Sequence, residues 1–74
     1  ADVLLRIAGG KTLAAHRHSS AERMILLSGR LRVKYDGNPA RILQTGHYAY
    51  GPAGLPHEAT CLGRQRCTLF IAFE

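Results

Sequence analysis

The sequence predicts an all-β fold, and three observations support this class. Short runs of apolar and β-branched residues alternate with turn residues roughly every 8 to 12 positions. No run has the length and the 3.6-residue period of a helix. The chain has no internal repeat and no low-complexity linker. Its 74 residues allow one domain, 1–74, and a domain of this size buries only about 60% of its unfolded surface. We therefore expect a small margin of stability.

The first half of the chain contains four predicted strands. Residues 2–7 form a short β-rich run that ends at a turn with two glycines. Residues 11–18 are expected to be extended. Residues 22–28 are predicted as a strand because they lack the length of a helix before the next glycine. A tight reversal then leads into residues 30–35.

The second half continues the pattern through glycine and proline turns. Asp36-Gly37 is a two-residue hairpin signal. The remaining predicted strands are 40–43, 47–50, 57–62 and 66–73, and the last two are expected to pair as a hairpin across residues 63–65. Two glycines and two prolines fix the loop 51–56, which should aim His57 inward.

Metal-ligand atoms are concentrated early in the chain. His16, His18 and Glu22 lie within seven residues, and the two histidines share a face if residues 12–18 are extended. Imidazole nitrogens suit zinc, copper, iron and nickel, and a carboxylate shifts the preference toward iron, manganese or zinc. His57 offers a further donor. The alternative is an ordinary solvated histidine pair beside an ordinary strand-start carboxylate.

Two spaced patterns favour the metal-binding interpretation. Gly10 to Gly29 reads G-x5-H-x-H-x3-E-x6-G, and Gly46 to His57 reads G-x5-P-x-G-x2-H. Together they resemble the two signature motifs of the cupin superfamily, over about residues 10–61. The sequence departs from the family pattern at Cys61, where an asparagine is usual, and at His47, where an acidic residue is common.

The resemblance implies a small antiparallel, jelly-roll-like cupin β-barrel with one divalent metal ion, which would be Fe, Mn, Zn, Ni or Cu. The metal ligands that it implies are His16, His18, Glu22 and His57. The alternative is a cupin barrel whose site is empty or is filled only adventitiously.

Alternation along the predicted strands identifies the residues around this ligand set. The pocket residues predicted in this way are Met24, Leu26, Ala59 and Cys61, with Tyr48 or Tyr50 offering a hydroxyl. One face of residues 66–73 should also contribute. A small, mostly apolar pocket implies a small, partly apolar substrate.

The expected function is a metal-dependent enzyme of oxygenase or isomerase type that acts on a small organic molecule. Four protein ligands leave one or two positions open at the metal. Iron or copper permits dioxygenase-like chemistry, whereas manganese, nickel or zinc favours Lewis-acid work such as isomerisation or decarboxylation. Glu22 could leave the metal and act as a base. The alternative is a sensor or storage module without turnover, because no dedicated proton shuttle is evident.

The chain carries a net charge of +5. Cationic and core-facing side chains alternate along one strand, as Arg30, Arg32 and Lys34 against Leu31, Val33 and Tyr35. A solvated sheet face is favoured over a nucleic-acid groove, because aromatic residues do not interleave with the cations. No apolar run approaches 18 residues, so no membrane span is expected.

Cys61 and Cys67 allow three interpretations. They form a disulfide if their Cα atoms lie within roughly 4.4 to 6.8 Å, they remain two buried thiols, or one thiol lies near the metal. A cytoplasmic location is the default, and a disulfide would favour a periplasmic or secreted one. The sequence starts without methionine and stops inside the apolar run 68–74. This suggests the core of a slightly longer chain, with unpaired sheet edges and hence a homodimer.

Overall fold

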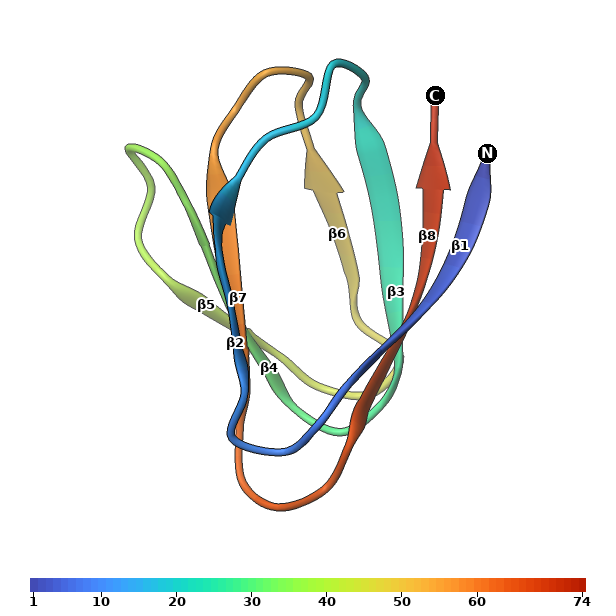
Figure 1. Cartoon of the computed structure of the whole chain (residues 1–74), viewed down its shortest axis with the longest axis vertical. Helices are drawn as coiled ribbons and strands as arrows, with labels where there is room; N and C mark the ends of the chain where they lie inside the picture. Colours follow the sequence, from blue (N-terminus) through green and yellow to red (C-terminus); the bar gives the residue numbers. More distant parts are fainter.

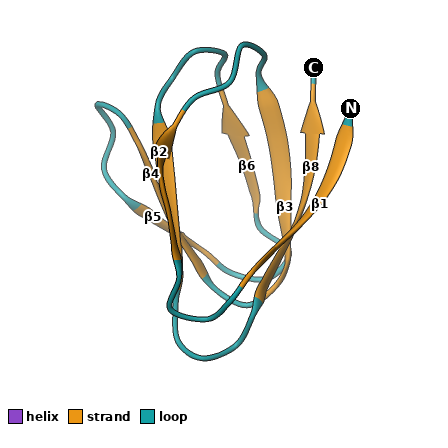
Figure 2. Ribbon diagram, viewed as in Figure 1, coloured by secondary structure: helices purple, strands orange, loops and turns teal.

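A computed structural model describes the backbone of all 74 residues and the side chains of all but Ala15 and His16. It contains eight strands, arranged as two four-stranded sheets that face each other (Figures 1 and 2). The described chain has no helix that is long and apolar enough to cross a membrane. The predicted all-β class is confirmed.

Every strand pairing is antiparallel. In the first sheet the order is β1 (Asp2–Ile7), β8 (Cys67–Phe73), β3 (Glu22–Ser28) and β6 (Tyr48–Gly51). In the second sheet the order is β2 (Thr12–His16), β7 (His57–Cys61), β4 (Leu31–Tyr35) and β5 (Arg41–Leu43). The strands β1, β6, β2 and β5 are therefore the edges.

The core lies between the two sheets and follows from strict alternation. Along β3 the buried positions are Glu22, Met24 and Leu26, and along β4 they include Leu31 and Val33. Of the predicted cationic face, Arg30 and Arg32 are exposed, whereas Lys34 is partly buried. Alternate side chains point to opposite faces of a strand, and one face of each sheet meets the other sheet.

The predicted last hairpin is wrong. β7 lies between β2 and β4 in the second sheet, whereas β8 lies between β1 and β3 in the first. The segment between β7 and β8 therefore crosses from one sheet to the other. Alternation identifies the buried face of each strand, but it does not determine which strand lies alongside. Cys61 and Cys67 are joined in a disulfide, with Cα atoms 5.8 Å apart, and this disulfide bridges the two sheets.

The first predicted ligand strand is shorter than expected. β2 ends at His16, and its register with β7 shifts between the pairs Leu13↔Ala59 and His16↔His57. Between these two pairs β2 advances by three residues and β7 by only two, so β2 contains one extra residue, as in a β-bulge. His18 therefore lies in the loop beyond the strand and not on the strand face.

The Asp36-Gly37 turn also differs from the predicted two-residue hairpin. The ladder between β4 and β5 begins at the pair Val33↔Arg41, which leaves a longer connection. The Asn38 N–H donates to the Tyr35 carbonyl at 3.0 Å, and Gly37 supplies the positive φ of 78°. Pro39 has no N–H to give to a ladder, which explains why the pairing starts later.

Two loops meet at one end of the barrel, above β3 and β7 (Figure 1). One connects β2 to β3 over residues 17–21, and the other connects β6 to β7 over residues 52–56. The Gly54 N–H donates to the His18 carbonyl at 2.8 Å. This hydrogen bond ties together the two loops that lead into the candidate site.

Candidate metal centre

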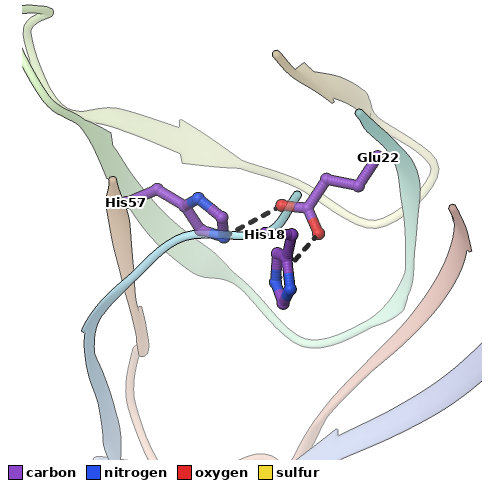
Figure 3. A group of neighbouring side chains, drawn as sticks. All are labelled: His18, Glu22 and His57. Atoms are coloured by element: carbon purple, nitrogen blue, oxygen red, sulfur yellow. Dashed lines mark ion pairs between the residues drawn. The ribbon is translucent and has the colours of Figure 1, made fainter. Parts of the chain in front are cut away.

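Three predicted ligands converge at this end of the barrel (Figure 3). Glu22 Oε1 lies 2.9 Å from His57 Nε2, and Glu22 Oε2 lies 3.7 Å from His18 Nε2. One potential ligand atom from each residue lies within 4.8 Å of the others. Residues from two distant segments therefore form one cluster of two imidazoles and a carboxylate.

Glu22 is placed by the start of β3. It is only 3% exposed, and its backbone partners are Gly51 on β6 and Phe73 on β8. A Cβ on Gly51 would lie 3.1 Å from Glu22 Cγ. Glycine at position 51 therefore leaves the room that the Glu22 side chain occupies. Among the described residues, only histidines pair with Glu22. A buried carboxylate is costly unless it is compensated by charge or hydrogen bonds.

His57 is oriented from both sides of its ring. Its Nδ1 lies 3.2 Å from the Leu55 carbonyl, and the Tyr35 ring packs against it with centroids 5.1 Å apart. An Nδ1–H donated to that carbonyl directs Nε2 toward Glu22, where it could bind a cation. Metal-binding histidines in general donate their other ring N–H in this way.

His18 completes the cluster from the loop 17–21. Its side chain is 34% exposed, and its ring packs edge-on against Phe73 with centroids 4.9 Å apart. His18 therefore lies on the solvent side of the cluster, while Glu22 and His57 are buried.

The donor set fits a divalent transition metal. Ligand atoms about 2.1 Å from one cation are separated by roughly 3.0 to 3.4 Å when they are neighbours at octahedral or tetrahedral angles. The separations from the two carboxylate oxygens, 2.9 Å from Oε1 to His57 and 3.7 Å from Oε2 to His18, bracket that range. With one ligand atom per residue, all separations are within 4.8 Å, so small side-chain shifts would close the set around a cation. Nitrogen and carboxylate ligands together suit iron, manganese or zinc.

A cavity of about 210 Å³ adjoins the cluster in the interior. His18, Glu22 and His57 are the only ionisable side chains in the described part of its lining, and the other lining residues are apolar. Those from the sheets include Met24, Ala59 and Ile71. The site therefore combines a few polar groups with an apolar wall, as small-molecule sites commonly do.

The predicted pocket residues fall into two groups. Met24 and Ala59 line this cavity, as do Leu69, Ile71 and Phe73 from the strand 66–73. Leu26 and Cys61 do not line it: both are fully buried, and Cys61 is bound in the disulfide. They lie too far along β3 and β7 from the cluster, although they face inward as expected.

Tyr48 and Tyr50 require a correction. Both are exposed, and neither lines the cavity beside the cluster. The inward position on β6 is Ala49, which pairs with Met24, so the two tyrosines take the outer face by alternation. The predicted ligand His16 pairs with His57 in the backbone register, and its side chain lies outside the described residues.

Tyr35 is a site residue that the sequence did not reveal. Its ring packs on His57, and its buried hydroxyl has no hydrogen-bond partner among the described residues. Burial, and then the negative charge of Glu22, raise the pKa of Tyr35 to about 12. Alternation placed Tyr35 on the core face, but only the register Tyr35↔His57 brings it to the cluster.

The fold and the cluster define a two-sheet β-barrel with a histidine–carboxylate site. A family model described as a cupin domain matches residues 3–73. The chain belongs to the cupin family. A search of curated proteins gave no match.

Several solved structures share this fold. DMSP lyase DddQ from Ruegeria pomeroyi DSS-3 is similar with a TM-score of 0.88 and 23% identity, over 99% of this chain and 36% of that one. A structure of Bacillus subtilis oxalate decarboxylase, concerned with its Mn(II) centres, has a TM-score of 0.86 and 26% identity, over 99% and 20%. The Drosophila melanogaster CENP-C cupin domain has a TM-score of 0.89 and 10% identity, over 99% and 59%. The chain thus spans little more than a third of the lyase and a fifth of the decarboxylase.

Proposed function

We propose that this cupin domain binds one divalent metal ion through His18, Glu22 and His57. We further propose that it acts there on a small, partly apolar organic molecule, as an enzyme of oxygenase or isomerase type. The observation that carries the proposal is the buried carboxylate of Glu22 between two imidazoles, in the wall of an otherwise apolar cavity. His16 is proposed as the fourth ligand on the basis of the family motif.

One structural neighbour supports metal-dependent chemistry, and a second supports enzymatic use of this fold. Oxalate decarboxylase carries Mn(II) centres and DMSP lyase is an enzyme, and both contain a domain of this shape. Their substrates are not transferred to this chain, because similar folds host different reactions.

The residues of the chain have separate roles in the proposed site. A bound metal would supply Lewis acidity or, as iron or copper, a centre for oxygen chemistry. The Leu55 carbonyl holds His57 in orientation, and the apolar wall excludes water from the substrate. Glu22 is the only carboxylate in the described lining of the cavity. It would therefore act as the general base that accepts a proton from the substrate.

A non-catalytic sensor or storage module is the second candidate. It is favoured by the scarcity of acid–base groups: apart from the three cluster residues, the described lining of the cavity is apolar. Such a site can hold a metal and a ligand without a group that relays protons to solvent.

Metal analysis of matched variants tests the proposed site. Elemental analysis should find about one divalent ion per chain in the native protein. We expect His18→Ala, His57→Ala and Glu22→Gln to lose at least tenfold in affinity. The controls are His47→Ala and Glu74→Gln, because both residues are exposed and lie outside the cluster. Unchanged metal content in the cluster variants would reject the site.

Turnover separates the two candidate functions. The metal-loaded protein is incubated with a panel of small carboxylic acids, with and without oxygen, and products are followed by mass spectrometry. Product formation that is lost in Glu22→Gln supports the enzyme. Saturable binding at the metal without any product supports the sensor or storage module.

A further inference from the structure

A second cavity lies on the other side of the barrel, between the edge strands β5 and β6. Its volume is about 380 Å³, within the range of small-molecule sites. Val33 and Leu43 face inward from the second sheet and contribute apolar surface to it. The cavity differs from the one beside the metal cluster: Val33 lines both, but His18, Glu22 and His57 do not line this one.

Arg41 gives this cavity a positive charge. It lines the cavity at the start of β5, together with Asn38. Within the described part of the chain, Arg41 forms no ion pair: the basic partners in the ion pairs there are His18, His57 and Arg23. Its guanidinium is therefore available to a carboxylate, which it can hold with two parallel hydrogen bonds.

The edge of β6 adds backbone donors to the cavity. The Leu26 N–H donates to the His47 carbonyl at 3.0 Å, and the register continues with Ile25↔Tyr48 and Met24↔Ala49. Bonded and non-bonded pairs alternate in an antiparallel ladder. The N–H and C=O groups of Tyr48 and Tyr50 therefore point away from β3, toward the open edge where the cavity lies.

Tyr35 forms the wall between this cavity and the metal cluster. It lines the cavity and packs on His57 with ring centroids 5.1 Å apart. Its hydroxyl is buried without a partner among the described residues. Tyr35 therefore offers this cavity the surface of its ring and not its hydroxyl.

We propose that the cavity between β5 and β6 is a second binding site, for a small organic carboxylate with an apolar body. Arg41 binds the carboxylate, Asn38 and the β6 edge offer further polar contacts, and the apolar body packs on Val33, Leu43 and the Tyr35 ring. The site does not require the metal.

Nuclear magnetic resonance titration with benzoate tests this site. Benzoate is added to ¹⁵N-labelled protein that has been treated with a chelator. We expect saturable shifts at the amides of Asn38, Arg41, Tyr48 and Tyr50. Benzamide, which has the same shape without the charge, should bind at least tenfold more weakly.

Two variants provide a matched comparison. Arg41→Gln should weaken benzoate binding at least tenfold, and Arg41→Lys should restore part of it. Arg32→Gln removes the same charge from the exposed outer face of the neighbouring strand and should leave binding within twofold. The Arg41 side chain is exposed, so these variants should fold, and the benzamide comparison requires no variant.

Three results would overturn the proposal: no saturable shift near the cavity, equal weakening by Arg32→Gln, or equal binding of benzamide. A parallel titration of metal-loaded protein covers the other site: benzoate shifts that appear only there, and only around His18 and His57, would place benzoate at the metal and overturn the proposal. Failure of the metal site leaves the expected result unchanged, since the titration uses metal-free protein.

Discussion

Glu22 Oε1 and His57 Nε2 lie 2.9 Å apart across the barrel interior, although Glu22 begins β3 of the first sheet and His57 begins β7 of the second. Each strand thus presents its first residue to the other sheet. The pair connects the sheets at the end where the loops 17–21 and 52–56 meet, so occupancy of this site should affect the stability of the whole barrel.

Metal removal should lower the melting temperature. Binding to the folded state alone stabilises it by about 2.7 kcal/mol at a metal concentration one hundred times the Kd. For a domain of this size that corresponds to a shift of roughly 10 °C or more. Calorimetry before and after chelation measures it. The shift should persist in His47→Ala and vanish in Glu22→Gln, and an unshifted melt of protein that had contained metal would contradict the prediction.

Gly51→Ala should disturb the cluster by crowding the side chains of Tyr35 and Glu22. A Cβ at this position would lie 3.0 Å from the Tyr35 hydroxyl oxygen and Cε1, and 3.1 Å from Glu22 Cγ. We expect a loss of about 1–2 kcal/mol in the free energy of unfolding from overpacking, with weaker metal binding. Urea unfolding measures the loss.

The double variant Gly51→Ala/Tyr35→Phe is the control for this mechanism. Removing the hydroxyl removes one of the close contacts, so the effects of the two substitutions should not add. Additive losses would show that the Tyr35 contact is not the cause.

Tyr35 should make stability depend on alkaline pH. Its pKa is about 12 in the folded protein, against 10.0 ordinarily, so between these values the unfolded chain binds fewer protons than the folded one. The stability from neutral Tyr35 is complete below about pH 10 and is lost as the pH rises to about 12. At a half-buried site this is on the order of 1 kcal/mol. Ultraviolet titration should show a late tyrosinate component that Tyr35→Phe removes. Its persistence in that variant would reject the assignment.

Reduction of the Cys61–Cys67 disulfide should destabilise the protein modestly. The two cysteines are six residues apart in sequence, and closing so short a loop contributes roughly 2 kcal/mol in the chain-entropy model. Melting with and without a reductant measures the effect, and thiol titration provides the control. Two free thiols in untreated protein would show that the bond is absent, and would remove the argument for an oxidising compartment.

A homodimer should form through the outer face of the first sheet. Leu4, Phe70, Ile25 and Tyr48 lie in register across all four strands, and all four are exposed. An exposed apolar row of this kind is typical of an interface. Sedimentation should report a dimer that Ile25→Lys dissociates. Ile42→Lys, at an exposed position on the second sheet, should not. A native monomer at working concentration would contradict the prediction.

The strands could be predicted from the sequence because period-two alternation and glycine turns are local signals. Seven of the eight predicted strands begin and end within one residue of the observed bounds, and β2 is the exception. Its bulge depends on pairing with β7, which no local pattern encodes. The assignment of β7 and β8 to different sheets is likewise a property of the whole fold.

The candidate site could be predicted in part. The cupin motifs identified His18, Glu22 and His57, which the structure brings together. Tyr35 escaped prediction because its role depends on the register with His57. Tyr48 and Tyr50 were placed wrongly for the same reason. Ala49 pairs with the inward-facing Met24 and is therefore the inward position of β6, and this register is not visible in the sequence.

The disulfide and the histidine–carboxylate cluster lie at opposite ends of the same pair of sheets: Cys67 begins β8, and Phe73, which packs on His18, ends it. The sulfur bridge fixes the spacing of the sheets at its own end. If the two sheets move apart, the separation should be smallest at the disulfide and largest at the residues that would bind the cation. Amide exchange should accordingly be slowest beside the disulfide and fastest at the rim of the cluster. Metal binding should slow exchange at the cluster and so reduce the difference between the two ends.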